Sequence, residues 1–210
     1  MTLGCGGVER SAAEPRRELP PVAAPSVDAR GIPTSRGGQE RVGQPAPEWG
    51  ALSWLGSEPL SLADLRGRVV LIRFWTDTCP FCRATAPALA TLDEDYRDRG
   101  VTVVGMYHPK PRGTERTAEQ VAEVTGEWGW QFPVALDLDW AVLDAYWLGE
   151  GKQAYTSVSF ILDAEGVIRY VHPGPEFHEG GPPKHEQCRQ DYRDIRTTLD
   201  ALLAEPVATL

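Results

Sequence analysis

One short stretch limits what this chain can fold into more than any other. A run of β-branched and aromatic residues over 69–75 leads through a polar turn to two cysteines, Cys79 and Cys82. Residues of helical composition follow, so the pattern predicts a buried strand, a turn and a helix that begins at the cysteines. Pro80 suits the first helical turn, because it lacks an N–H and has a fixed φ.

The position of the two cysteines indicates their chemistry. Cys79 would meet the positive end of the helix dipole, which favours a thiolate over a thiol and so supplies an attacking sulfur. Cys82 can then resolve the mixed disulfide. A structural zinc site is the alternative, but it needs a second pair of ligands at comparable spacing. Since Cys5 and Cys188 are isolated, we interpret Cys79 and Cys82 as a redox pair.

Three motifs carry a resemblance to a known family. Phe74-Trp75-x-x-x-Cys79-Pro80-x-Cys82 is preceded by Leu65-Arg66-Gly67-x-Val69-Val70-Leu71 and followed by Phe160-Ile161-Leu162-Asp163-x-x-Gly166. Together they resemble the TlpA-like branch of the thioredoxin superfamily, over about residues 43–205. The resemblance implies an extracytoplasmic bacterial thiol-disulfide oxidoreductase of the protein disulfide reductase type, with the first cysteine as nucleophile and the second as resolving thiol.

This resemblance also implies partners and neighbours of the site. The partners would be protein thiols or disulfides and an upstream electron donor or acceptor, and we expect no cofactor. We expect the active-site neighbours to be Trp75, Thr76, Pro80, Phe81 and Ser157.

Composition agrees with a single domain. The chain has 210 residues, of which 41% are hydrophobic and 24% charged, so it can bury one sizeable core. A formal net charge of −9 argues against a nucleic-acid partner, which needs a basic face. The sequence contains no run of eighteen apolar residues that would cross a membrane.

The first 44 residues differ in composition from the rest. They are rich in Pro, Ala, Gly, Arg and Glu without apolar periodicity, which predicts a disordered linker before a domain over 45–206. Within this linker, Leu3-Gly4-Cys5-Gly6-Gly7 resembles the end of a bacterial lipoprotein signal, in which Cys5 would carry lipid and tether the enzyme to a membrane. The apolar stretch that should precede such a cysteine is missing, so a chance match in a Gly-rich tail is the alternative.

Hydrophobic periodicity predicts strands that alternate with helices. We expect strands over 69–75, 101–107, 132–136, 158–163 and 167–171, and helices over 80–99, 114–127, 140–148 and 186–203. A further short strand is expected within 48–54, with Trp49 and Trp54 as anchors. This order predicts a thioredoxin-like α/β fold, in which helices flank a central mixed sheet.

Arg73 is a departure from the family pattern, because an acidic or amide residue often precedes the Phe-Trp pair. A buried arginine would need a carboxylate partner, for which the candidates are Asp77, Glu94 and Asp163. Alternatively the side chain extends from the strand end into solvent.

Ser157 is the second departure. It stands where thioredoxin-like proteins carry a cis-proline that faces the cysteine pair. A cis bond before a residue other than proline costs about 2.5 to 4 kcal/mol, so we expect a trans bond. We also expect the Ser157 N–H or hydroxyl near Cys79, where either can hydrogen-bond the thiolate.

Two other functions remain open. Thr76-x-x-Cys79 partly resembles a peroxiredoxin motif, which favours a thiol peroxidase, but Ile72 and Ser157 stand where that motif needs a proline and an arginine. A catalytically idle fold that binds thiols or metal is the third hypothesis. It leaves the intact Cys79–Cys82 pair unexplained.

Histidines supply the remaining candidates. His172, His178 and His185, with Cys188 close behind, can bind a transition metal, or Cys188 can act as an extra thiol. The alternative is a Pro/Gly-rich surface loop with incidental histidines. His108 follows a predicted parallel strand, so it either lies near the cysteines or is a solvated loop residue.

Overall fold

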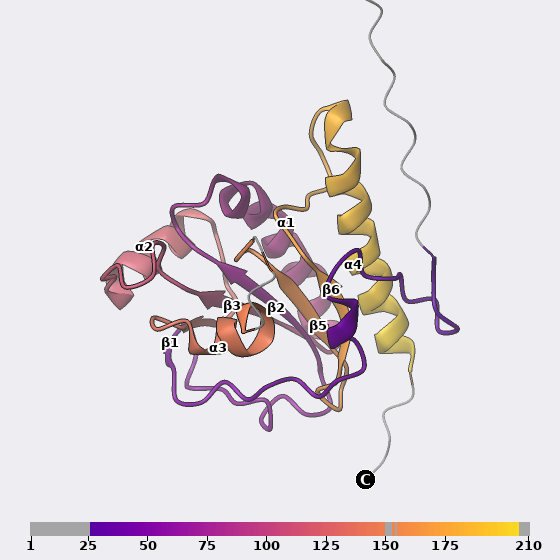
Figure 1. Cartoon of the computed structure of the whole chain (residues 1–210), viewed down its shortest axis with the longest axis horizontal. Helices are drawn as coiled ribbons and strands as arrows, with labels where there is room; N and C mark the ends of the chain where they lie inside the picture. Colours follow the sequence, from indigo (N-terminus) through magenta and orange to yellow (C-terminus); the bar gives the residue numbers. More distant parts are fainter. Residues whose placement is uncertain (1–25, 150–152, 154, 206–210) are drawn as a thin grey trace, which may run out of the picture.

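The computed structural model describes residues 26–149, 153 and 155–205, which form a mixed six-stranded sheet with helices on both faces (Figure 1). The strand order is β1-β4-β3-β2-β5-β6. The strands are β1 (Ser53–Leu55), β2 (Val69–Trp75), β3 (Val101–Tyr107), β4 (Val134–Leu136), β5 (Ser159–Leu162) and β6 (Ile168–His172). The β2–β3 and β3–β4 pairs are parallel, while β1–β4, β2–β5 and β5–β6 are antiparallel. The expected fold class is confirmed.

Strand β2 lies inside the sheet and is buried along its whole length. Its side chains alternate between two cores, as the period of a strand requires. Leu71 and Trp75 pack with helices α1 (Pro80–Tyr96) and α4 (Glu186–Ala204), whereas Ile72 packs on the other face. Arg73 has the same parity as Leu71, so it points toward the face covered by α1 and α4.

The other helices complete the two layers. Helix α2 (Ala118–Glu127) contributes to the same core as α1 and α4. It begins later than expected, because Thr117 caps it through a capping box with Gln120. Helix α3 (Ala141–Leu143) continues as the π-helical turn η3 (Asp144–Leu148) and covers the opposite face. Short 3₁₀ turns flank two of the helices, η2 (Arg97–Arg99) after α1 and η4 (Pro183–His185) before α4.

Part of the expected linker belongs to the domain. Residues 1–25, and Cys5 with them, lie outside the described residues, but residues 26–44 pack against the sheet and α4 and include the short turn η1 (Gln39–Arg41). Ile32 is 3% exposed within the α1/α4 core, and the Val171 N–H donates to Ser35 Oγ at 2.9 Å. Arg36 forms an ion pair with Asp191 on α4. The prediction of disorder over 26–44 is therefore wrong.

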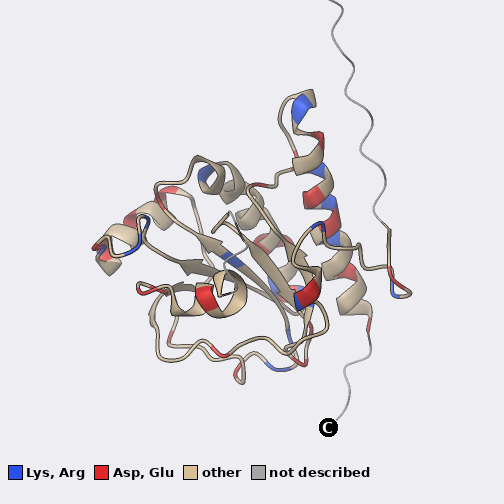
Figure 2. Cartoon of the chain, in the orientation of Figure 1, with Lys and Arg blue, Asp and Glu red and all other residues tan. Residues whose placement is uncertain are grey.

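Acidic and basic residues are intermixed along the described chain, most visibly along α4 (Figure 2). Among the described residues, no helix is long and apolar enough to cross a membrane.

Candidate active site

The cysteine pair lies at the carboxyl edge of β2, where the turn after Trp75 enters helix α1. Cys79 is the N-cap of this helix, with extended backbone angles, and Pro80 is its first residue. Cys79 is partly exposed and Cys82 is 2% exposed, and both sulfurs are free thiols. The strand, turn and helix expected from the sequence are confirmed around the pair.

Three kinds of hydrogen bond stabilise the Cys79 thiolate. They come from the Cys82 thiol, from the Ser157 hydroxyl and from the backbone N–H groups of Cys82 and Phe81, and together they lower the pKa of Cys79 to about 5 against the effect of burial. The two N–H groups belong to the open first turn of α1, which has no intrahelical acceptor for them. Cys79 is therefore a thiolate at neutral pH.

The pKa of Cys82 is shifted in the opposite direction. The hydrogen bond that it donates to Cys79 raises its pKa, and burial raises it further, while the positive charge of Arg73 acts against both. The pair therefore holds one proton at neutral pH, on the buried sulfur. One sulfur is therefore ionised and partly exposed, and the other is protonated and buried.

Ser157 lies between the two sulfurs. Its Oγ is 3.6 Å from Cys79 Sγ and 3.0 Å from Cys82 Sγ. The bond before it is trans, because the cis bonds among the described residues are Lys110–Pro111 and Gly174–Pro175. The expected trans bond and the expected hydrogen bond to the cysteine pair are both confirmed.

Arg73 is fully buried beside the thiols. The prediction that a carboxylate forms an ion pair with it is wrong. Its guanidinium donates instead to the Ser157 carbonyl at 3.0 Å, to Ser159 Oγ at 3.2 Å and to the Pro175 carbonyl at 2.6 Å. Burial lowers the pKa of Arg73, and the charges of Cys82 and Cys79 oppose that effect. Because an arginine stays protonated in proteins, its positive charge faces the dithiol.

Carbonyls replace carboxylates at Arg73 because two of the candidate acids are engaged elsewhere. Asp77 pairs with Arg116 at 2.8 Å, and Asp163 pairs with Arg169 at 2.7 Å. Residues far apart in the sequence supply the carbonyl acceptors, which no local pattern could reveal.

The remaining expected neighbours differ in exposure. Trp75 and Thr76 are buried, and Trp75 packs edge-on against Tyr107 and Trp130. Pro80 is exposed, and Phe81 is 41% exposed. The surface next to the Cys79 sulfur is therefore partly apolar.

His108 is not a solvated loop residue. It is completely buried, and its ring lies edge-on to Trp140 with 5.0 Å between the centroids. Burial is the main reason that its pKa falls to about 3, so it is neutral at physiological pH. Its expected closeness to Cys79 stays a prediction.

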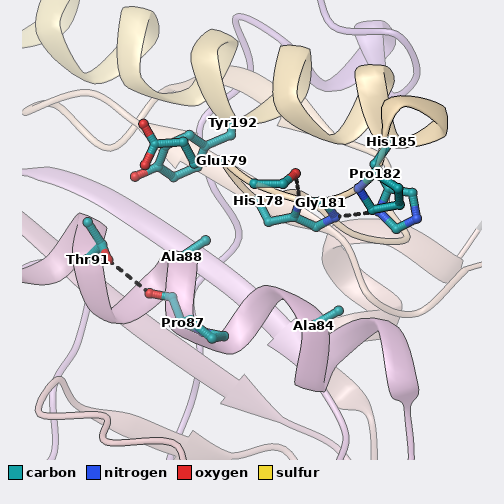
Figure 3. Close-up of a pocket in the computed structure, with 11 residues that line it drawn as sticks. Ala84, Pro87, Ala88, Thr91, His178, Glu179, Gly181, Pro182, His185 and Tyr192 are labelled. Carbon is teal, nitrogen blue, oxygen red and sulfur yellow. Dashed lines mark hydrogen bonds between the residues drawn. The ribbon is translucent and has the colours of Figure 1, made fainter.

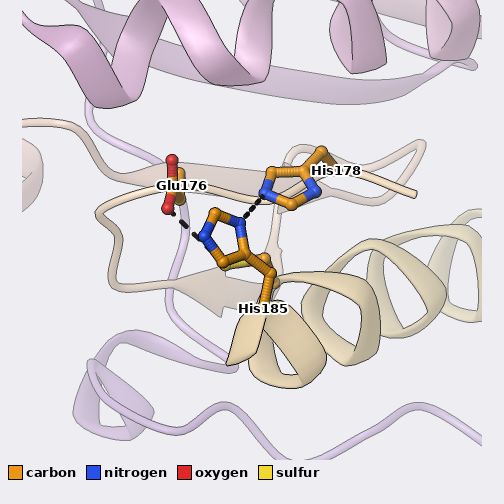
Figure 4. A group of neighbouring side chains, drawn as sticks. Glu176, His178 and His185 are labelled. Atoms are coloured by element: carbon orange, nitrogen blue, oxygen red, sulfur yellow. Dashed lines mark hydrogen bonds between the residues drawn. The ribbon is translucent and has the colours of Figure 1, made fainter. Parts of the chain in front are cut away.

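The histidine cluster assembles differently from the expectation. His172 is buried apart from the others, with Nε2 3.2 Å from an Asp191 carboxylate oxygen. His178, His185 and Cys188 come together with Glu176, which the sequence analysis missed. Figure 4 shows Glu176 beside the two histidines. One donor atom from each of the four lies within 4.8 Å of the others. The position of Glu176 two residues before His178 in an extended loop was the available signal.

Most of the domain matches a known protein family. The model of a family described as AhpC/TSA matches residues 42–171. DipZ of Mycobacterium tuberculosis is 31% identical over 134 residues, which are 62% of this chain but only 18% of DipZ. The thiol-disulfide oxidoreductase ResA of Bacillus thuringiensis is 25% identical over 128 residues, which are 61% of this chain and 67% of ResA.

The fold is similar to solved structures as well. A crystal structure described as a thioredoxin-like superfamily protein superposes with a TM-score of 0.60 and 22% identity. The match covers 78% of this chain and 99% of the solved one. This likeness shows that the fold is thioredoxin-like.

Proposed function

The chain belongs to the AhpC/TSA family, and from that membership we propose that it is a thiol-disulfide oxidoreductase whose nucleophile is Cys79 and whose resolving thiol is Cys82. The unequal ionisation of the two sulfurs carries the proposal: a partly exposed thiolate at a helix N-terminus and a buried thiol beneath it. The name of the ResA relative supports the same class of reaction.

The reaction balances without a cofactor. The Cys79 thiolate attacks one sulfur of a substrate disulfide, forms a mixed disulfide and releases the other substrate sulfur as a thiolate. Cys82 then loses its proton and attacks Cys79 Sγ, so the Cys79–Cys82 disulfide forms and the second substrate sulfur leaves. The substrate gains two electrons and the enzyme loses two. The reverse sequence oxidises a dithiol.

Two neighbours assist the second step. Ser157 Oγ contacts both sulfurs, so its hydroxyl is placed to accept the Cys82 proton and pass it on. Once Cys79 is in a mixed disulfide it carries no charge, and Arg73 is then the fixed charge beside Cys82. A buried cation favours the Cys82 thiolate and so lowers the barrier to resolution.

We propose protein disulfides as substrates, because Pro80 and Phe81 offer an exposed apolar surface beside Cys79. Because the chain resembles the TlpA-like branch, we propose that the reaction takes place outside the cytoplasm, with an upstream electron donor or acceptor. A lipid tether at Cys5 belongs to the same proposal.

Trapping experiments test the assignment. Cys82→Ser should accumulate mixed disulfides with a model disulfide protein, while Cys79→Ser should lose exchange activity. Cys5→Ser is the matched control and should exchange at the wild-type rate. Undiminished exchange in Cys79→Ser would overturn the assignment.

One observation keeps the peroxidase as a second candidate: Arg73 brings a positive charge to the thiolate, as peroxide reduction requires. Consumption of hydrogen peroxide by the reduced protein as fast as disulfide reduction would favour that function. We expect much slower consumption.

A further inference from the structure

A second group of chemically competent side chains lies outside the dithiol, between strand β6 and helix α4. Glu176 and His178 come from the loop after β6, His185 ends the turn η4, and Cys188 lies in the first turn of α4. Figure 4 shows Glu176 and the two histidines. The set offers one carboxylate oxygen, two imidazole nitrogens and one sulfur. Zn²⁺ takes this mixture of donors in four-coordinate protein sites.

The hydrogen bonds of His178 fix which of its nitrogens is free to bind. Its Nδ1 lies 2.9 Å from the Gly180 carbonyl, which can only accept, so Nδ1 carries the proton. The lone pair of His178 Nε2 is therefore directed at His185 Nδ1, which lies 2.9 Å away. An imidazole that donates its outer N–H to a backbone carbonyl is the usual arrangement of a histidine ligand to zinc.

Two distances between donors are close to those around a tetrahedral ion, and all four donors lie within 4.8 Å of one another. Two nitrogens on one zinc lie roughly 3.3 Å apart, and a sulfur and an oxygen roughly 3.5 Å apart, given the usual bond lengths and tetrahedral angles. The two imidazole nitrogens are 2.9 Å apart, and Cys188 Sγ is 3.7 Å from a Glu176 oxygen. Small side-chain shifts would convert these contacts into coordination bonds.

The backbone around the cluster is shaped for the two rings. Gly181 has a φ of 94°, and a Cβ placed there would lie 2.9 Å from His178 Cε1 and 3.2 Å from His185 Nδ1. A glycine therefore allows the chain to pass directly beside both imidazoles. The Arg189 guanidinium donates to the carbonyls of Gly181, Pro182 and Pro183, which holds this turn against α4.

An ion can reach the cluster from solvent. A pocket of about 440 Å³ lies between α1 and the start of α4, and His178 and His185 form part of its wall (Figure 3). The opposite wall comes from α1, through Ala84, Pro87, Ala88 and Thr91. The access path meets a requirement of a metal site.

We propose that Glu176, His178, His185 and Cys188 form a Zn²⁺ site that is separate from the redox dithiol. With four protein ligands the site is closed, so the ion has a structural role and no open position for substrate. It would fasten the loop after β6 to the first turn of α4.

That loop also contacts the dithiol site. The Pro175 carbonyl accepts from Arg73, and the Phe177 N–H donates to Thr85 Oγ1 on α1. The Arg73 guanidinium also lies over the Phe177 ring, 5.4 Å from its centroid. A zinc ion would therefore stabilise the segment that holds Arg73 in place.

Cobalt substitution tests the site independently of disulfide exchange. The full-length reduced protein is titrated with Co²⁺, which reports a thiolate ligand through a near-ultraviolet charge-transfer band and tetrahedral geometry through its visible spectrum. We expect one equivalent bound with both signatures, displaced by one equivalent of Zn²⁺. The Cys79→Ser/Cys82→Ser double variant and Cys5→Ser should give the same spectra.

Ligand variants should behave differently from their neighbours. Cys188→Ala should lose the charge-transfer band, and His185→Gln should weaken binding about 100-fold or more, since loss of even an outer-shell partner costs 10- to 100-fold. Glu179→Gln, an exposed carboxylate in the same loop, is the matched control for Glu176→Gln and should bind normally. Metal-free unfolding curves identify any variant that fails to fold.

Stability gives a second readout. Zn²⁺ should raise the melting temperature of the wild type and of Glu179→Gln, but not that of Cys188→Ala, because a ligand stabilises only a fold that binds it. Loss of the cobalt spectrum in the dithiol double variant, retention of the thiolate band in Cys188→Ala, or the absence of stoichiometric binding to the wild type would each overturn the proposal.

Discussion

Arg73 is the residue that most distinguishes this dithiol site. Within the described part of the chain, its buried guanidinium donates to two carbonyls and a serine hydroxyl rather than to a carboxylate, and its charge acts on both sulfurs. The Cys82 thiol is the group that gains most from it, because burial and the hydrogen bond to Cys79 otherwise disfavour its thiolate.

We therefore expect Arg73→Met to slow resolution of mixed disulfides and to shift the pH midpoint of that step upward. The change also leaves the Ser157 and Pro175 carbonyls without a donor, which should lower the free energy of unfolding by about 1–3 kcal/mol per unsatisfied group. Stopped-flow measurement of mixed-disulfide decay against pH gives the first quantity, and urea titration gives the second.

Arg73→Lys is the control because it keeps the charge while losing the forked geometry. It should resolve mixed disulfides faster than Arg73→Met. Equal resolution rates and midpoints in the wild type and Arg73→Met would show that the arginine has only a structural role.

At the scale of residues, local chemistry was readable from the sequence and long-range chemistry was not. Cys79, Cys82 and Ser157 could be placed because short motifs fix their positions on a turn, a helix and a strand end. The acceptors of Arg73 could not, because Pro175 lies 102 positions away. Glu176 was missed for the same reason: the path of the Pro/Gly-rich loop decides which side chains meet.

At the scale of elements, a strong hydrophobic pattern predicted the positions of strands correctly. Strands β2 and β3 were predicted to the residue, because their runs are predominantly apolar and bounded by glycine or polar turns. The prediction of disorder over residues 26–44 was wrong, because this segment is attached by a few isolated anchor residues rather than by a periodic apolar face. Composition alone could not distinguish such a segment from a disordered linker.

The anchoring of this segment can be measured. Ile32→Ala should lower the free energy of unfolding by about 2–5 kcal/mol, because it empties a site within the α1/α4 core. Val27→Ala, in the same segment but 58% exposed, should change it by less than about 0.5 kcal/mol. Urea unfolding curves of the full chain compare the two. An equally small change in the free energy of unfolding for both variants would show that the segment contributes nothing to the core.

At the scale of the whole molecule, the ionisation of Cys79 links redox state to stability. The folded reduced protein holds Cys79 with a pKa of about 5, below the ordinary value of a thiol in the unfolded chain. Between these two values the unfolded chain binds one more proton, so the stability of the reduced form should rise as pH rises. This stabilisation is complete above the unfolded pKa and is lost as pH falls through about 5.

Urea midpoints of the reduced protein at pH 5.5 and pH 8 measure this linkage. The wild type should gain more stability over that interval than Cys79→Ser, which lacks the ionisation. An identical pH dependence in the two proteins would mean that Cys79 titrates alike in the folded and unfolded chains.

The most direct measurement of the central claim is the pH profile of alkylation at each cysteine of the reduced wild-type protein, resolved by mass spectrometry of the modified peptides. We predict that Cys79 reacts with a midpoint near pH 5, while Cys82 stays unmodified at neutral pH. In the metal-free protein Cys188, whose pKa is raised mainly by burial, serves as the internal reference and should react only at higher pH. Equal reaction rates at Cys79 and Cys82, or a Cys79 midpoint near that of an ordinary thiol, would contradict the account.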